Sequence, residues 1–154
     1  MARPASVFVA SSTIDAPAER LFAFHEEPGA LERLTPPWQP VEFVERPPNI
    51  KNGSRAILRV GPWPFRIRWI LEHRGYVAGR EFSDVQLSGP FRSWKHTHRM
   101  TPLGLGACTL EDRIEYQLPF GALGDLLGGW YVQRKLTRLF EFRHRVTAEA
   151  MREP

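Results

Sequence analysis

The stretch GPFRSWKHTHRM, residues 89–100, carries two histidines that are two residues apart and close to a tryptophan. Alternate side chains of a β-strand lie on one face, so Trp94, His96, His98 and Met100 share a face of the strand predicted here. An imidazole can bind a metal, transfer a proton, or hydrogen-bond through both nitrogens. Which of these functions applies depends on the side chains that the neighbouring strands place next to the two histidines.

Two further predicted strands carry acids that can partner the histidines, in the segments REFSDVQLSG and CTLEDRIEYQLP. We expect the faces that bear Trp94 and Tyr116 to point inward, because large aromatic side chains are costly to leave in water. Buried polar groups need partners, so carboxylate–imidazole hydrogen bonds are expected among them. This choice turns five polar side chains inward: Asp84, Gln86, His96, His98 and Asp112.

Metal binding is one interpretation of the two histidines. A zinc site needs three or four protein ligands, and an oxygen ligand from Asp84, Asp112 or Glu72 would complete it. The spacing of the histidines specifies no third ligand. We therefore expect no bound metal and no cofactor, and we interpret His96 and His98 as polar groups of a pocket.

Acid–base catalysis by a His–Asp pair is the second interpretation, and the same pair can instead simply orient a ligand. Nucleophilic catalysis has less support, because the single cysteine, Cys108, has no adjacent base and the chain contains no GxSxG motif. No individual catalytic residue is assigned from the sequence.

The order of elements indicates an α+β fold. Residues 6–14 alternate as a strand, two short helices follow, and about six further strands run in series through residue 118. Consecutive strands joined by short turns pair antiparallel, and a sheet of this length must bury one face. We predict a curved antiparallel sheet of about six to seven strands wrapped around a long C-terminal helix.

That long helix is predicted from about Ala122 onward by apolar residues at helical spacing. Gly128 and Gly129 weaken its start and favour a bend there. Arg143 interrupts the apolar stripe; it either reaches inward to Asp112 or Asp84, or extends to the surface. The stripe is formed by Val132, Leu136, Leu139, Phe140, Arg143, Val146 and Ala150.

Composition limits the class of protein. The chain has 154 residues, is 42% hydrophobic, and is expected to form one domain over residues 1–154. The net charge of +4 comes from scattered basic residues without a nucleic-acid-binding motif, so no nucleic-acid partner is expected. The absence of a signal peptide, of a long apolar run and of paired cysteines favours a cytoplasmic protein without a membrane-spanning segment. The oligomeric state is not specified.

Four segments resemble the SRPBCC, or START-like, superfamily: PGALERLTPPWQPV, FSDVQLSGPFRSWKHTHRM, DRIEYQLPFGALG and LFEFRHRV. Within it the chain is similar to the bacterial polyketide-cyclase-like, ligand-binding subgroup. The resemblance implies the helix-grip fold, in which a cavity lies between the sheet and the long helix. In some relatives such a domain is fused to an epimerase-like domain, and we expect that part to be missing here.

The expected function is binding of a hydrophobic small molecule with an oxygen-bearing polar group in that cavity. The alternatives are a cyclase-, dehydratase- or hydrolase-like enzyme that uses the His/Asp cluster, and an interaction domain whose cavity has collapsed. Twelve residues are expected to form the ligand site: Trp69, Asp84, Gln86, Trp94, His96, His98, Asp112, Tyr116, Leu136, Leu139, Phe140 and Arg143.

Overall fold

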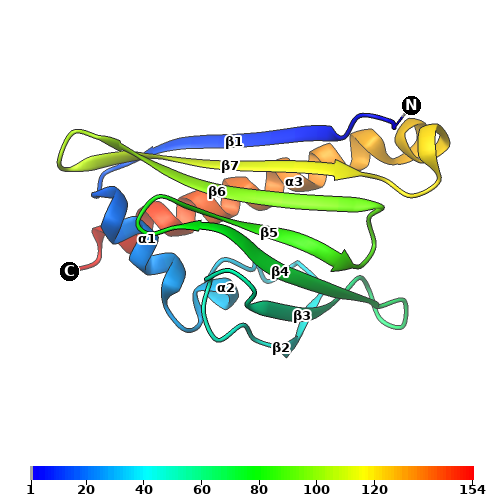
Figure 1. The fold of residues 1–154 in the computed structure, drawn as a ribbon, viewed down its shortest axis with the longest axis horizontal. Helices are drawn as coiled ribbons and strands as arrows, with labels where there is room; N and C mark the ends of the chain where they lie inside the picture. The colour runs from blue at the N-terminus through cyan, green and yellow to red at the C-terminus, as the bar shows by residue number, and fades with distance from the viewer. Residues whose placement is uncertain (1) are drawn as a thin grey trace.

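A computed structural model describes residues 2–154, which form one curved sheet, two short helices and one long helix (Figure 1). The elements in chain order are β1 (Ser6–Ile14), α1 (Ala18–Glu26), α2 (Ala30–Arg33), β2 (Val41–Glu45), β3 (Arg55–Val60), β4 (Ile67–Val77), β5 (Glu81–Ser88), β6 (Ser93–Leu103), β7 (Ala107–Gln117) and α3 (Gly121–Arg152).

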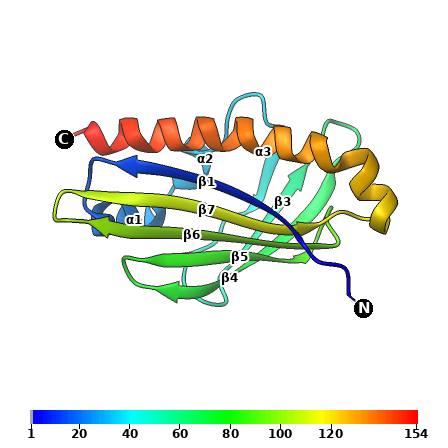
Figure 2. The same ribbon diagram turned by 90° about the horizontal axis from the view of Figure 1, so that it is seen from above.

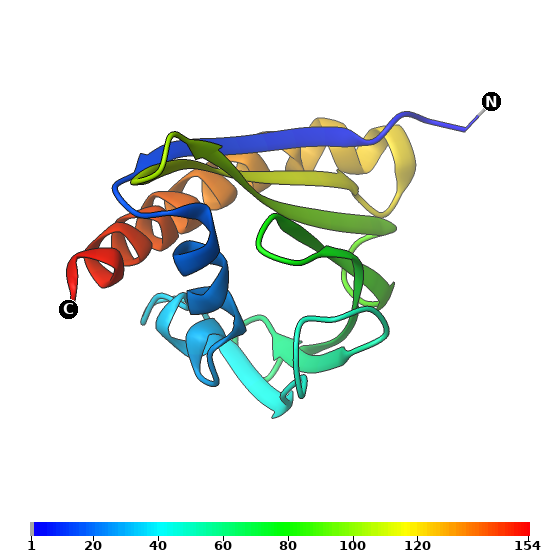
Figure 3. The same cartoon turned by 60° about the vertical axis from the view of Figure 1, so that its left-hand side comes forward.

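The sheet is antiparallel, with strand order β1-β7-β6-β5-β4-β3-β2. From β2 to β7 each strand pairs with the next one in the chain, and β1 closes the order by pairing with β7. The connection from β1 to β2 holds α1 and α2, which lie below the sheet's β1 end in Figure 3. The predicted helix-grip architecture, with its two short helices after the first strand, is confirmed.

The faces of β6 and β7 that were predicted to point inward are the buried faces in the structure. Along β7 every second residue is buried, and Tyr116 is only 1% exposed. On β6 the buried face holds Trp94, His96, His98 and Met100. The inward choice for the aromatic-bearing faces of β6 and β7 is therefore correct.

Helix α3 runs continuously for 32 residues and lies across the sheet near β1 and β7 (Figure 2). Its first turns bend away from the axis of the remaining helix, as Gly128 and Gly129 led us to expect. Its buried side chains recur at helical spacing: Leu136, Phe140, His144, Thr147, Ala150 and Met151.

The core consists of two apolar clusters with a polar layer between them. On β6, Trp94 belongs to one cluster and Met100 to the other, and His96 and His98 lie between them. On α3, His144 likewise lies between Phe140 and Met151. Several elements thus place polar residues at the same level, so the layer is a property of the fold and not of one strand.

Within residues 2–154, no helix has both the length and the apolar composition needed to cross a membrane. Cys108 is completely buried next to the β6–β7 turn.

Candidate functional site

A cavity of about 300 Å³ lies beside the polar layer. Its walls come from α1, α2, the segment 46–50, strands β2 to β6, and one part of α3. From α3 it is lined by Leu139, Phe140 and Arg143. The resemblance implied a cavity between the sheet and the long helix. Only this middle part of α3 lines the cavity that the structure shows, and Trp130, nearer the start of the helix, is 65% exposed.

The structure brings eight of the twelve predicted site residues to the cavity wall. They are Trp69, Asp84, Trp94, His96, His98, Leu139, Phe140 and Arg143. Trp69 and Trp94 pack edge to face, with ring centroids 5.0 Å apart. The other four residues, Gln86, Asp112, Tyr116 and Leu136, do not line the cavity.

Gln86 holds the turn between β5 and β6 instead. Its side-chain Nε2 donates to the carbonyl of Phe91 at 2.7 Å, and its Oε1 accepts from the Phe91 amide at 3.3 Å. The turn packs tightly against Trp69, because a Cβ on Gly89 would lie 2.3 Å from Trp69 Cδ1. The alternation of side chains along the strand did not reveal that Gln86 closes a turn.

Tyr116 and Leu136 fill the space between β7 and α3. Both are buried in the apolar cluster that contains Trp94 and Phe140. The Tyr116 hydroxyl accepts a hydrogen bond of 2.7 Å from Gln133 Nε2. The helix therefore packs directly on β7, and the open space lies farther along the sheet.

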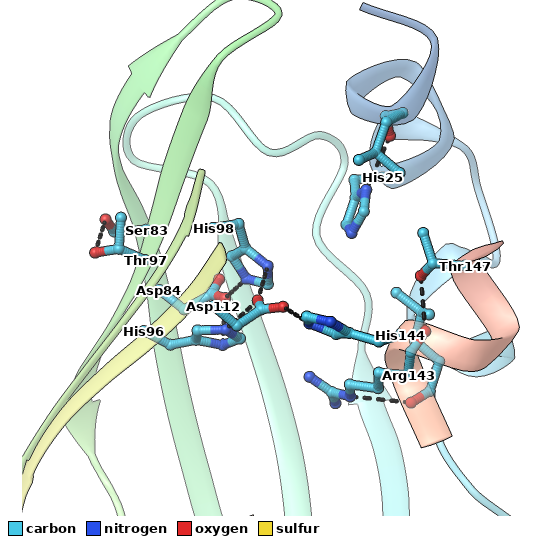
Figure 4. Close-up of polar contacts among 12 residues, drawn as sticks. His25, Ser83, Asp84, His96, Thr97, His98, Asp112, Arg143, His144 and Thr147 are labelled. Carbon is cyan, nitrogen blue, oxygen red and sulfur yellow. Dashed lines mark hydrogen bonds and ion pairs between the residues drawn. The ribbon is translucent and has the colours of Figure 1, made fainter. Parts of the chain in front are cut away.

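Asp112 lies behind the cavity wall and is 3% exposed. Its Oδ1 accepts a hydrogen bond from His96 Nε2 at 2.7 Å, and its Oδ2 accepts one from His144 Nε2 at 2.7 Å (Figure 4). His98 Nδ1 also lies 3.0 Å from Oδ1, although its direction is too poor for a hydrogen bond. Three imidazoles thus surround one buried carboxylate.

Asp84 is the second carboxylate and faces the cavity. Its Oδ2 lies 3.0 Å from His98 Nε2 and 3.8 Å from His96 Nδ1, and its Oδ1 lies 3.0 Å from His73 Nε2. His96 and His98 therefore connect the two carboxylates. The predicted carboxylate–imidazole hydrogen bonds are confirmed.

All five histidines of the chain meet here, although the sequence indicated only two. His144 approaches from α3 and also contacts the Ser12 hydroxyl through Nδ1 at 2.6 Å. His25 approaches from α1, with its ring centroid 5.8 Å from that of His98. His73 comes from β4. One signal could have revealed His144, because it lies four residues after Phe140 on the buried face of α3.

Strand register explains how the cluster assembles. His73 lies opposite Asp84, and Asp84 lies opposite His96, across the β4–β5 and β5–β6 pairs. His98 lies opposite Asp112 across the β6–β7 pair. Side chains directly opposite one another in an antiparallel pair are close enough to interact. Four consecutive strands thus bring their polar residues into two adjacent rows.

Arg143 turns inward, but it reaches neither acid by a hydrogen bond in the described residues. Its Nε donates to the carbonyl of Leu34 at 3.0 Å, and its guanidinium lies 5.2 Å from the centre of the Phe140 ring. Burial lowers the pKa of Arg143, while the charges of Asp112 and Asp84 oppose that change. The arginine therefore ties α3 to the end of α2 and lines the cavity.

The environment divides the histidines into charged and neutral groups. Burial disfavours the charge on His98, but the close carboxylate of Asp112 and the hydrogen bond to Asp84 outweigh burial and raise its pKa to about 9. Burial and the charge of His98 lower the pKa of His96 to about 4, and the same two causes lower that of His25 to about 4. At neutral pH, His98 is protonated, whereas His96 and His25 are neutral.

Both carboxyl groups stay ionised. Burial raises their pKa values, but imidazole hydrogen bonds and positive charges outweigh burial, so the pKa values of Asp84 and Asp112 lie below their ordinary range. Two negative charges therefore face the positive charges of His98 and Arg143. A buried network of this kind is stable only while its charges balance.

A family model described as polyketide cyclase / dehydrase and lipid transport matches residues 14–141. The chain belongs to this family. The match covers most of the sheet and the greater part of α3, including every residue of the cavity wall except Arg143. The resemblance to the SRPBCC, or START-like, superfamily is confirmed by this match. No curated protein matches the chain.

Solved structures share the SRPBCC fold. A nucleoside-diphosphate sugar epimerase from Corynebacterium glutamicum aligns with a TM-score of 0.73 and 24% identity over 92% of this chain, which spans only 28% of the epimerase. A START superfamily protein from Mycobacterium smegmatis aligns with a TM-score of 0.67 and 12% identity, covering 94% of this chain and 96% of that protein.

An enzyme also shares the fold. Norcoclaurine synthase from Thalictrum flavum, in complex with dopamine and hydroxybenzaldehyde, aligns with a TM-score of 0.69 and 12% identity, covering 95% of this chain and 86% of the synthase. At these identities the likeness concerns the fold alone, because one fold supports many unrelated functions.

Proposed function

We propose that the protein binds a hydrophobic small molecule whose oxygen-bearing group lies at the His/Asp end of the cavity. The observation that carries this proposal is the composition of the cavity wall. Apolar side chains such as Leu58, Val60 and Trp69 form one part, and Asp84, His98 and Arg143 form another. Ligand pockets commonly combine an apolar wall with a few converging polar groups, and about 300 Å³ is at the small end of their range.

Arg143 is the polar group best suited to hold the ligand. Within residues 2–154 its side-chain hydrogen bond comes from Nε, so Nη1 and Nη2 are the donors open to a ligand oxygen. A guanidinium binds carboxylate and other anionic oxygens strongly. The small molecule is therefore expected to carry a carbonyl, hydroxyl or carboxylate group.

The direct experiment is native mass spectrometry of protein purified from its own host. A co-purifying compound with an apolar body and an oxygen group supports the proposal. A ligand-free spectrum, together with no binding of apolar probes, contradicts it. The co-purified compound also identifies the ligand class without a prior choice of candidates.

Replacing Arg143 by Met should weaken binding of anilinonaphthalene sulfonate, an apolar probe with an anionic oxygen group. We expect the Kd to rise roughly 10-fold to 100-fold, since a hydrogen bond to a charged group contributes about 1.5–3 kcal/mol. Binding is measured by the quenching of tryptophan fluorescence, because Trp69 and Trp94 line the cavity. Arg145→Met, an exposed arginine two residues away, is the matched control and should bind as the wild type does.

Filling the cavity should abolish probe binding while the protein stays folded. Ala56 lies in the wall on β3 and is 4% exposed, so Ala56→Phe places a phenyl ring in the open space. Overpacking a filled core costs about 1–3 kcal/mol, and a true cavity accepts the ring at lower cost. Unchanged binding would place the probe elsewhere. A large loss of stability would favour the collapsed-cavity interaction domain.

An enzyme is the second candidate, and the linked His–Asp pairs favour it. Asp112 orients His96, whose Nδ1 lies 3.8 Å from Asp84 in the cavity wall, and such a pair can transfer protons. The norcoclaurine synthase of T. flavum holds dopamine and hydroxybenzaldehyde, two aromatic molecules with oxygen groups. Conversion of the co-purified compound to a product of different mass, lost in His96→Ala, would establish catalysis.

A further inference from the structure

Three side chains from two strands converge at the polar end of the cavity. One ligand atom each from Asp84, His96 and His98 lies within 4.8 Å of the others. Asp84 Oδ2 is 3.0 Å from His98 Nε2 and 3.8 Å from His96 Nδ1. Ligand atoms that share one small cation lie about 3–4 Å apart, because each is about 2.0–2.2 Å from the ion.

In His96 and in His98, the ring nitrogen that is not next to Asp84 lies close to the carboxylate of Asp112. His96 Nε2 donates to Asp112 Oδ1 at 2.7 Å, and His98 Nδ1 lies 3.0 Å from the same oxygen. A metal-binding histidine usually turns its other nitrogen toward a carboxylate or carbonyl, which fixes the ring and its tautomer. Asp112 is placed to do this for both rings. This arrangement leaves His96 Nδ1 and His98 Nε2 directed toward Asp84.

The Asp84 carboxylate is also held from behind. Its Oδ1 lies 3.0 Å from His73 Nε2, and His73 Nδ1 lies 3.2 Å from the carbonyl of Ser54. Oδ2 is thereby kept on the side of His96 and His98. The three candidate ligands are thus positioned by partners from neighbouring elements, as the rigid ligands of metal sites are.

We propose that Asp84, His96 and His98 bind one divalent transition-metal ion of the zinc type. Two imidazoles and a carboxylate suit zinc and its first-row neighbours, whereas magnesium and calcium prefer oxygen ligands alone. All three residues line the cavity, so an ion bound by them would lie at the cavity wall. The site does not depend on the small molecule proposed above.

The charges of the cluster allow a cation at this point. Asp84 and Asp112 both lie 3.0 Å from His98, and a metal ion would take the place of the proton that His98 carries between them. The expectation that the protein holds no metal rested on the lack of a third ligand in the sequence. The register of β5 with β6, which sets Asp84 opposite His96, supplies that ligand.

The test is a calorimetric titration in which Zn²⁺ alone is added to protein that has been treated with a chelator. We expect one ion per chain with a micromolar or tighter Kd. Co²⁺, used as a second probe, should give the visible absorption of a site with nitrogen and oxygen ligands. Binding of the apolar probe is measured in a separate experiment. If the protein binds no small molecule, the measured Kd for Zn²⁺ still tests the metal site.

His98→Ala should weaken Zn²⁺ binding by at least about 100-fold, which exceeds the 10- to 100-fold typical for losing an outer hydrogen bond. Asp112→Asn should fall within that smaller range. His25→Ala removes a cavity imidazole that lies outside the three-ligand group and should leave the Kd unchanged. Circular dichroism checks that each variant folds.

Absence of Zn²⁺ binding, or a millimolar Kd, in the wild type would overturn the proposal without reference to any variant. Equal losses in His98→Ala and His25→Ala would overturn the assignment of ligands. Should His98→Ala fail to fold, Asp84→Asn is the second variant. A wild-type Kd in Asp84→Asn would contradict the proposed carboxylate ligand.

Discussion

Asp112→Ala is expected to lower the free energy of unfolding by about 3–5 kcal/mol, the cost of breaking a buried ion pair by removing one partner. Asp112 accepts hydrogen bonds from His96 and His144 and lies 3.0 Å from His98 Nδ1. Alanine leaves these imidazoles without their acceptor. It also leaves the protonated His98 with Asp84 as its one carboxylate partner in the network. Urea unfolding with a chelator present measures the effect without any contribution from a bound ion.

Glu111→Ala is the matched control for this prediction. Glu111 precedes Asp112 on β7, faces outward and lies 3.8 Å from Arg99 in a surface ion pair. Exposed pairs contribute about 0–1 kcal/mol. A loss below about 1 kcal/mol in Asp112→Ala, equal to that of the control, would show that the polar layer adds little to stability.

Periodicity predicted the fold because β7 and the later part of α3 keep their period, although β2 and β4 contain register shifts. The alternation in β7 and the helical stripe of α3 each define one buried face, and a face of that size can be buried only against another element. The strand count, the two short helices and the helix-grip arrangement follow from these patterns. The bend in the first turns of α3 was also predictable, because Gly128 and Gly129 have low helix propensity.

The candidate site was predictable in part. Parity on β6 placed His96 and His98 on the buried face, and parity on β5 and β7 identified Asp84 and Asp112 as their partners. Side-chain alternation does not give the register between strands. In the sheet, Asp84 lies opposite His96, and His98 lies opposite Asp112. The hydrogen bonds are instead diagonal, from His98 to Asp84 and from His96 to Asp112, which the sequence could not show.

His25 and His144 could not be assigned to the cluster because their contacts depend on distant packing, whereas His73 lies opposite Asp84 on a neighbouring strand. His144 meets Asp112 across 32 residues of sequence, and Arg143 meets Leu34 across 109. His25 enters the cluster only because α1 packs below β6. A single sequence contains no signal for such contacts until the elements are placed.

The position of the cavity depends on sheet curvature, which side-chain patterns do not specify. Near β7 and β1, Tyr116, Leu136 and Phe8 fill the space between the sheet and α3. Beyond β6 the strands β5 to β2 turn away from α3, as Figure 3 shows, and α1 and α2 close that side. The open volume therefore lies beside β2 to β6, and Leu136 is the one helix residue assigned to it from the sequence that does not line it.

Phe140 marks the boundary between these two regions. It is 2% exposed, belongs to the apolar cluster with Tyr116 and Leu136, and also lines the cavity. Its ring packs edge to face with His96 at 5.2 Å and lies 5.6 Å from the ring of Phe8. One side chain thus supports both the apolar core and the imidazole nearest to it.

Phe140→Ala should therefore lower the free energy of unfolding by about 3–5 kcal/mol, as expected for truncating a buried phenylalanine. The void joins the existing cavity, so the neighbouring side chains cannot close it without moving the backbone. Leu126→Ala, on the exposed part of the same helix, is the control and should change stability by less than about 0.5 kcal/mol. Denaturant unfolding of both variants compares them directly. If Phe140→Ala cost under about 1 kcal/mol, α3 would not be packed against the sheet at this point, and the cavity would lack the wall described here.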